Sequence, residues 1–213
     1  WSWLYNMVLF GISSGAAVFV SQYWGDKNIK GINRTTGIAV SAGLITSVVF
    51  LLAGLLIPDK IIYIFNQNPE VIKHGAVYLR YACLSYPALA LTNILGSVLR
   101  SAEQPKLPTL VSGISSVANV ILNYVLIFPA GLGVKGAAIA TAISSWLGPI
   151  LIISISAMRK NILYAPLRDI FSFNRKTLAE FFKKALPVIA NETMWGLGTV
   201  VYNIIFANIG HEE

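Results

Sequence analysis

Glu192 is an ionisable side chain within a long apolar stretch, and it is the residue best suited to bind and release a cation. Eight residues separate it from Lys184, so on a helix the two lie about 12 Å apart along the axis. If that helix crosses a membrane, the carboxylate must be protonated, paired or hydrated, and such residues commonly mark transport sites. The alternative is that the membrane helix begins only at Thr193, which leaves Glu192 at the interface.

A second polar group is carried by an apolar stretch near the middle of the chain. Ser112, Ser116, Asn119 and Asn123 are spaced by four, three and four residues, so they share one face of a helix. Amides in hydrocarbon need hydrogen-bond partners, and this face should look onto other helices or a water-filled cavity. Interhelical hydrogen bonding and ligand binding are both open at this point.

These side chains require long apolar helices, and the composition is typical of them. Apolar residues make up 55% of the chain and charged residues 12%, with a mean hydropathy of +0.67, so lipid must surround most of it. Stretches long enough to cross a bilayer, about 20 residues each, occur at 1–25, 35–58, 81–99, 107–134, 136–158 and 193–210. The last is extended backwards by 185–191. We therefore predict an all-α membrane protein with six transmembrane helices.

The basic residues indicate the orientation of these helices. Twelve of the 16 lie in alternate loops, after the first, third and fifth spans. Short cytoplasmic loops retain Lys and Arg, so these loops are predicted to be cytoplasmic, and Lys60, Lys73, Arg80 and Lys135 external. The net charge of +7 follows from this bias, and nucleic-acid binding is not expected.

Other chemistries find little support in the sequence. Cys83 is the single cysteine, so the chain can form no internal disulfide and no thiolate metal site, and no cofactor is expected. The stretch Gly11-Ile12-Ser13-Ser14-Gly15 has the spacing of a serine nucleophile elbow, but that motif needs a strand-to-helix turn and a His partner. His74 and His211 lie outside the apolar spans. An enzyme is therefore not predicted.

Three segments resemble the multidrug and toxic compound extrusion (MATE) family of transporters. The stretch 96–144, GSVLRSAEQPKLPTLVSGISSVANVILNYVLIFPAGLGVKGAAIATAIS, is similar to the family's fourth-to-sixth-helix segment. It contains an Asn-rich helix ending in Leu-Ile-Phe, although Gln104-Pro105-Lys106 replaces a Lys-Pro pair. GISSGAAVFVSQYWGDKN at 11–28 resembles the end of the second helix, and ALPVIANETMWGLGTVVYNIIFANIG at 185–210 resembles the seventh.

The resemblance implies a two-lobed transporter of twelve helices, of which this chain would hold helices two to seven. Residues 1–158 would form helices two to six of the N-terminal half. Residues 159–184 would form a basic cytoplasmic connector, and 185–213 the first helix of the C-terminal half. Because the chain opens with Trp1 inside an apolar run and stops as a span ends, we expect further segments on both sides.

The family's activity implies an antiporter of the cell membrane, driven by H⁺ or Na⁺, that exports cationic amphipathic drugs or toxins. Asn119 and Asn123 match the family's fifth-helix asparagines, and Glu192 matches an acidic position in the seventh helix, so these three would bind substrate or ion. The complete protein would be monomeric. The alternatives are a lipid-linked oligosaccharide flippase, whose cavity would carry more basic residues, and a non-transporting membrane scaffold, which would need no intramembrane carboxylate.

Overall fold

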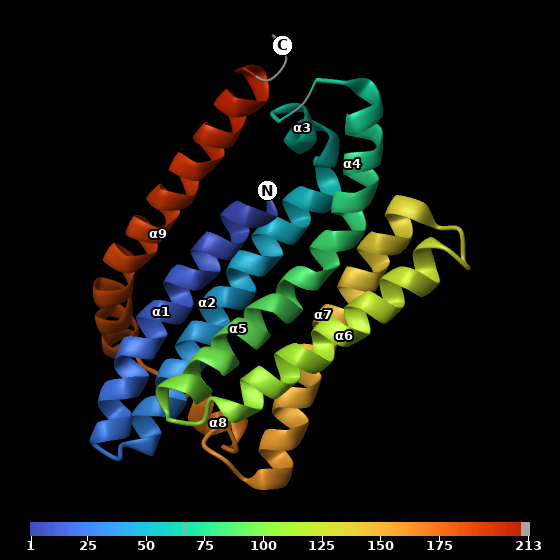
Figure 1. The fold of residues 1–213 in the computed structure, drawn as a ribbon. Helices are drawn as coiled ribbons and strands as arrows, with labels where there is room; N and C mark the ends of the chain where they lie inside the picture. Colours follow the sequence, from blue (N-terminus) through green and yellow to red (C-terminus); the bar gives the residue numbers. More distant parts are fainter. Residues whose placement is uncertain (66, 210–213) are drawn as a thin grey trace.

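The computed structural model describes residues 1–65 and 67–209, and their ordered elements are all helical. The helices run up and down in one bundle with a short cap of two helices at one end (Figure 1). Their bounds are α1 Ser2–Gly25, α2 Ile29–Leu56, α3 Pro58–Tyr63, α4 Pro69–Ala82, the 3₁₀ turn η1 Cys83–Ser85, α5 Tyr86–Ser101, α6 Lys106–Ile127, α7 Gly133–Arg159, α8 Leu167–Ile170 and α9 Arg175–Ile209.

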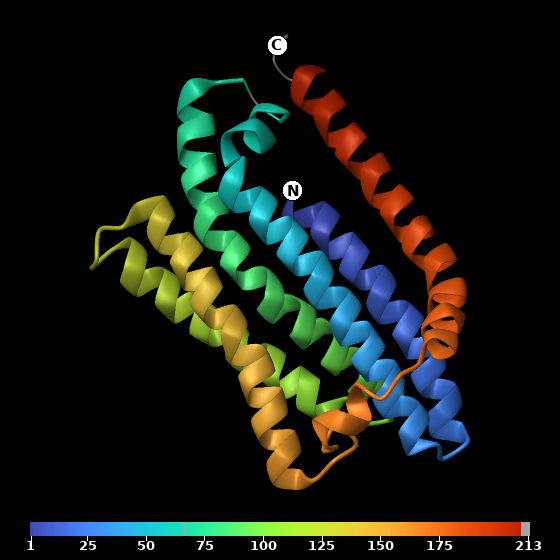
Figure 2. The same ribbon diagram turned by 180° about the vertical axis from the view of Figure 1, so that it is seen from behind.

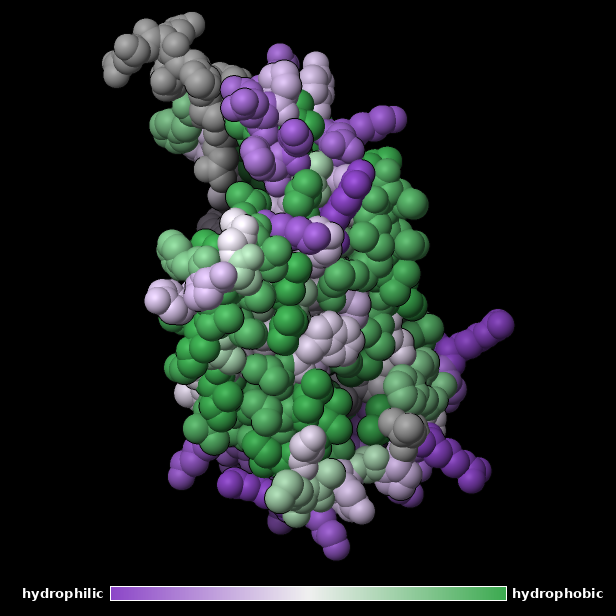
Figure 3. Space-filling view, turned by 90° about the vertical axis from the view of Figure 1, so that its right-hand side faces the viewer, coloured by the Kyte–Doolittle hydropathy of each residue, from purple (hydrophilic) through white to green (hydrophobic). Residues whose placement is uncertain are grey.

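Five segments among the described residues are long and apolar enough to cross a membrane. They are Ser2–Gly25, Ile29–Leu56, Pro69–Ser101, Lys106–Ile127 and Gly133–Arg159. Each coincides with one of the predicted spans. The surface agrees with this assignment, because a broad apolar band separates the hydrophilic residues at the two ends of the bundle (Figure 3).

The sixth predicted span is not among these five, although most of it lies in a helix. Residues 193–209 are the last part of α9, and residues 210–213 lie outside the described part of the chain. The helix is longer than expected because it already begins at Arg175, inside the segment predicted as a connector. Its 35 residues span about 52 Å, which exceeds a hydrocarbon core of about 30 Å.

The third predicted span, 81–99, lies within a longer helical segment, Pro69–Ser101. Its helix begins at Pro69, because Pro occupies the first helical position and the Asn68 side chain accepts a hydrogen bond from the Glu70 amide at 2.9 Å. The helix then tightens into η1 just before Pro87, whose missing amide hydrogen removes one helical hydrogen bond.

The centre of the bundle is formed by α1, α2 and α5. Tyr5 and Tyr86 are fully buried near one end, with ring centroids 4.3 Å apart, and the Tyr5 hydroxyl lies 2.8 Å from Ser47 Oγ. Helices α6 and α7 form a hairpin on one side of this centre, and α9 lies on the opposite side against α1 (Figures 1 and 2).

The three loops predicted to be cytoplasmic lie at the same end of the bundle. These are the turns between α1 and α2 and between α5 and α6, and the segment after α7 that contains α8 (Figure 1). Gly37 of α2 is the point where that segment meets the bundle, since a Cβ at Gly37 would overlap the Ile170 carbonyl oxygen. Helix α8 is therefore seated directly on the α2 backbone.

Candidate functional site

Helices α1 and α9 are antiparallel and pack closely through glycine residues of α1. A Cβ built on Gly11 would lie 2.6 Å from the Ile189 Cα, and one on Gly15 would lie 2.6 Å from the Ala185 Cβ. Both distances are well below ordinary carbon contacts of about 3.5–4.0 Å. Gly11 and Gly15, which are four residues apart, therefore allow α1 to approach α9 closely. This contact is called the α1–α9 seam below and comprises Gly11, Gly15, Ala185 and Ile189.

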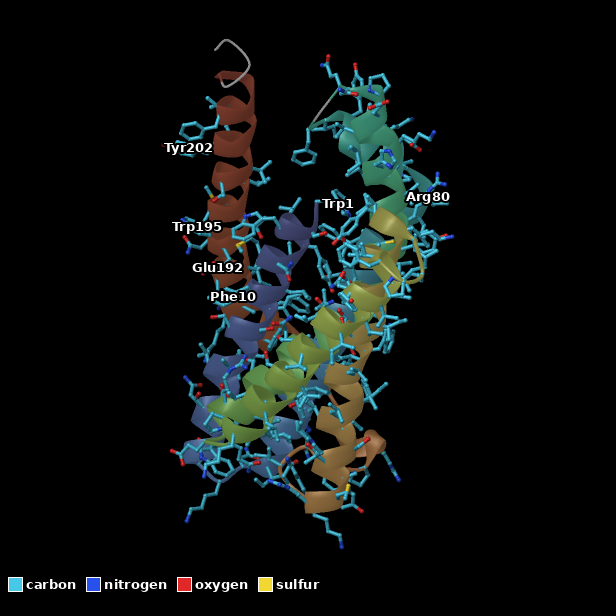
Figure 4. All side chains as sticks on the ribbon, turned by 45° about the vertical axis from the view of Figure 1, so that its right-hand side comes forward. Trp1, Phe10, Arg80, Glu192, Trp195 and Tyr202 are labelled. Carbon is cyan, nitrogen blue, oxygen red and sulfur yellow. The ribbon has the colours of Figure 1, made fainter. Side chains whose placement is uncertain are left out.

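Glu192 belongs to the face of α9 that forms this seam. It follows Ala185 and Ile189 by seven and three residues, and precedes Gly196, whose Cβ would lie 2.5 Å from Met7 Cγ of α1, by four. Figure 4 places Glu192 on α9 at a height similar to that of Phe10 on α1. Its side chain is partly exposed and has no hydrogen bond or ion pair with the described residues. A carboxylate without a partner can accept a proton or a metal ion.

The charged residues of α9 indicate how far Glu192 lies from the end of the bundle. Lys184 Nζ lies 4.9 Å from the centroid of the Phe19 ring in α1, and Phe181 stacks on the same ring at 5.6 Å. From Lys184 the helix continues without interruption to Glu192, about 12 Å further along. Pro187 lies between them and cannot donate to the Lys183 carbonyl, which permits a bend.

The two asparagines of α6 lie together and reach α7. Asn119 Nδ2 donates to Ser144 Oγ at 2.9 Å, and Asn123 Nδ2 donates to Asn119 Oδ1 at 3.0 Å and to the Asn119 carbonyl at 2.9 Å. Ser144 Oγ in turn donates to the Thr141 carbonyl at 3.2 Å. This chain of bonds leaves Asn123 Oδ1 as an acceptor without a bonded donor among the described residues.

Ser144 is the member of this cluster that sequence reasoning missed. It lies in a segment with several small residues, Thr141 and Ser145 among them, and nothing in the sequence distinguishes it from them. The contact shows that the predicted polar face of α6 divides into two parts. Asn119 and Asn123 are half-buried against α7, whereas Ser112 and Ser116 are exposed. The bond to Ser144 supports interhelical packing, and the exposed part supports a face open to a cavity.

Glu192 and the asparagine pair are not brought together within the described part of the chain. Helix α9 packs against α1 on one side of the bundle, and α6 packs against α7 on the other (Figures 1 and 2). Nor do the described residues contain a group of three or more His, Cys, Asp or Glu side chains that could hold a metal ion. A cation bound at either place would therefore depend on neutral oxygens or a single carboxylate of this chain.

A family model described as MatE matches residues 1–125, which is more than half of the sequence. The chain belongs to the MATE family. This assignment confirms the resemblance of the motifs to a family of membrane transporters, which is not a family of enzymes, and the candidate spans of the chain agree with a multi-pass membrane protein.

The relatives of this MATE chain are considerably longer than the chain itself. It is 28% identical over 203 residues to a multidrug export protein MepA from Staphylococcus saprophyticus, a match that covers 95% of this chain and 44% of the relative. The solved structure of an inward-facing multidrug resistance MATE transporter is similar with a TM-score of 0.81 and 20% identity, over 92% of this chain and 44% of that one. The structure of an outward-facing multidrug resistance MATE transporter is similar with a TM-score of 0.77 and 21% identity, over 89% of this chain and 42% of that one. The chain thus spans less than half the length of the proteins it matches, and these structures show the fold alone.

Proposed function

We propose that this chain is part of an ion-coupled antiporter that exports cationic amphipathic compounds across the cell membrane. The single observation that carries the proposal is Glu192, a carboxylate without a bonded partner on the α1-facing side of α9. Support comes from the relative in Staphylococcus saprophyticus, which is named a multidrug export protein. In this proposal α9 supplies the sixth membrane span, and H⁺ or Na⁺ drives export.

The proposed division of the chain follows from this assignment. Residues 1–158 form helices two to six of one half, 159–184 form a cytoplasmic connector, and 185–213 begin the second half. The complete protein is proposed to act as a monomer surrounded by lipid. A flippase for lipid-linked sugars is less well supported, because the uncharged stretches predicted as spans contain no interior Lys or Arg.

Glu192 alternates between a bound cation or proton and the substrate in this mechanism. Coupling requires that the loaded and empty carriers differ in how readily they change conformation. A carboxylate can make that difference, because neutralising it removes the cost of placing a charge in a poorly hydrated helix contact. Asn119 and Asn123 are proposed to offer amide oxygens to a cation or substrate, with Asn123 Oδ1 as the oxygen left free.

The test replaces Glu192 with Gln in the complete transporter. Gln keeps the size and the hydrogen-bonding capacity of the side chain but cannot titrate, so expression should be normal while ion-coupled export is lost. The measurement is the accumulation of a fluorescent cationic dye in cells lacking other exporters, with pH and Na⁺ gradients imposed separately. Glu180→Gln is the matched control, because Glu180 is an exposed glutamate in the charged first part of the same helix. Export by Glu192→Gln at the rate of Glu180→Gln under both gradients would refute the role of Glu192.

A further inference from the structure

A cavity of about 320 Å³ lies between α2, α5 and α7 on one side and α8 with the segment before it on the other. Its wall is largely apolar, with Val40 from α2, Leu91 and Leu95 from α5, and Ile153 from α7. Ile153, Tyr164 and Phe171 also line the cavity, and each exposes about half of its side chain at the surface. The cavity therefore opens to the outside between aromatic and aliphatic side chains. Aromatic residues in such positions are typical of the boundary between lipid and water.

Asn33 is a polar residue of the cavity wall whose side chain makes no hydrogen bond with the described residues. This side chain is 8% exposed. Two other polar side chains of the wall have partners within the chain, since Thr36 donates to the Ile32 carbonyl and Ser156 accepts from Asn161. The Asn33 amide is therefore available to a ligand that enters the cavity. A ligand with a carbonyl group could accept a hydrogen bond from it.

Basic residues outnumber acidic residues in the sequence next to the cavity-lining residues, and this excess indicates the kind of ligand. Five basic residues and one acidic residue lie within three positions of a cavity-lining residue: Lys30, Arg34, Arg159, Lys160 and Arg168, and Asp169. This end of the bundle is the one predicted to be cytoplasmic, where bilayers carry anionic phospholipids that attract basic segments. A cationic drug would be repelled by the same residues, so the exported compound is not the expected occupant.

We propose that the cavity binds an anionic phospholipid of the cytoplasmic leaflet, with one acyl chain inside and its phosphate among the surrounding basic residues. The Asn33 amide then donates to a glycerol-ester carbonyl. Tyr164 and Phe171 flank the acyl chain of the lipid where it enters the cavity. Because α8 forms part of the wall and rests on Gly37, the bound lipid holds the connector against the bundle. This site lies apart from Glu192 and from the asparagine pair, and the proposal does not depend on either.

The test measures lipid binding to the complete, delipidated protein in detergent by native mass spectrometry. The probes are phosphatidylglycerol and phosphatidylcholine with identical acyl chains, added in increasing amounts. The first phosphatidylglycerol should bind at least about fivefold more tightly than phosphatidylcholine, which corresponds to one engaged basic residue. Asn33→Leu, which keeps the approximate shape of the side chain, should lower the affinity for phosphatidylglycerol about twofold to tenfold, because it removes one hydrogen bond.

Two further variants separate the cavity from the general membrane surface. Leu91→Phe adds volume inside the cavity and should abolish the first binding event, whereas Leu110→Phe, on the exposed face of α6, should not. Arg168→Gln should weaken the binding of phosphatidylglycerol. Lys106→Gln should leave it unchanged, because Lys106 begins α6 at the same end of the bundle and is eleven positions from the nearest cavity-lining residue, Leu95. The native circular dichroism spectrum of each variant identifies any that fail to fold.

Two results would overturn the proposal. One is equal binding of the two lipids together with no effect of Leu91→Phe in a folded variant. The other is displacement of the first phosphatidylglycerol, one for one, by the cation tetraphenylphosphonium, which would make the cavity a substrate site. Neither result bears on Glu192, because the assay measures no transport.

Discussion

The close contact between α1 and α9 predicts that replacing Gly11 or Gly15 with Ala has a steric cost. In Gly11→Ala the new Cβ would lie 2.6 Å from the Ile189 Cα, a backbone atom that can move only with its helix. To reach an ordinary contact of about 3.5–4.0 Å, α1 and α9 must separate locally by about 1 Å. Gly15→Ala meets the Ala185 Cβ at the same distance, so it should behave in the same way.

The size of the effect is best measured against a glycine in open space. A Cβ on Gly113, in α6, would meet no atom within 4 Å, so Gly113→Ala gains only the preference of Ala over Gly in a helix, about 0.5–1 kcal/mol. Gly11→Ala receives the same gain but also an overpacking cost of about 1–3 kcal/mol. The two variants should therefore differ by about 1–3 kcal/mol in stability.

The assay is thermal unfolding of the purified protein in detergent. For 150–250 residues each kcal/mol shifts Tm by about 2–4 °C, so Gly11→Ala should melt about 2–12 °C below Gly113→Ala. Gly11→Leu should melt lower still, because a larger side chain must enter the same contact. Equal melting temperatures for all three variants would show that α9 does not pack on α1 in this way.

Three other predictions concern topology, the asparagine pair and the connector. In the complete protein, cysteines placed at Lys30 and Lys176 should be shielded from an impermeant thiol reagent in intact cells while one at Lys60 reacts, and the opposite labelling would reverse the topology. Asn119→Leu should lower dye export far more than Ile121→Leu, although loss of the bond to Ser144 should cost only about 0.6 kcal/mol; equal export by both variants at matched expression would favour a packing role. Gly37→Val should displace α8 and speed trypsin cleavage at Arg168 and Arg175 several-fold relative to Gly113→Val, and unchanged cleavage would contradict the seating of α8 on α2.

Much of the fold could be predicted because hydrophobic length and charge asymmetry are local signals. They located five spans and placed three basic loops at one end of the bundle. The length of the helix that contains the third span was not predicted, because Asn68-Pro69 is compatible with a turn as well as with a helix N-terminus. The hydrogen bond from the Glu70 amide to the Asn68 side chain occurs in both, and only the helix that follows, Pro69–Ala82, decides between them.

The pairing of helices distant in sequence could not be predicted in the same way. The spacing of Gly11 and Gly15 indicated that α1 approaches some helix closely, but small residues do not specify which one. Likewise, Asn119 and Asn123 required a partner, and Ser144 is one of several small polar residues on α7 that could have supplied it. Which two helices pack together depends on how their whole surfaces fit, and a short sequence motif does not carry that information.

The position of Glu192 beside the seam gives its proposed role a structural basis that depth in the membrane alone would not. Ile189 and Gly196 flank Glu192 on the same face of α9, and both lie in close contact with α1. Any relative movement of α1 and α9 must therefore change how much water reaches the carboxylate. In the proposed mechanism this movement therefore alters the affinity of Glu192 for a bound cation. By linkage, binding of a cation at Glu192 then shifts the equilibrium of the same movement by an equal factor, which is the reciprocity that coupling requires.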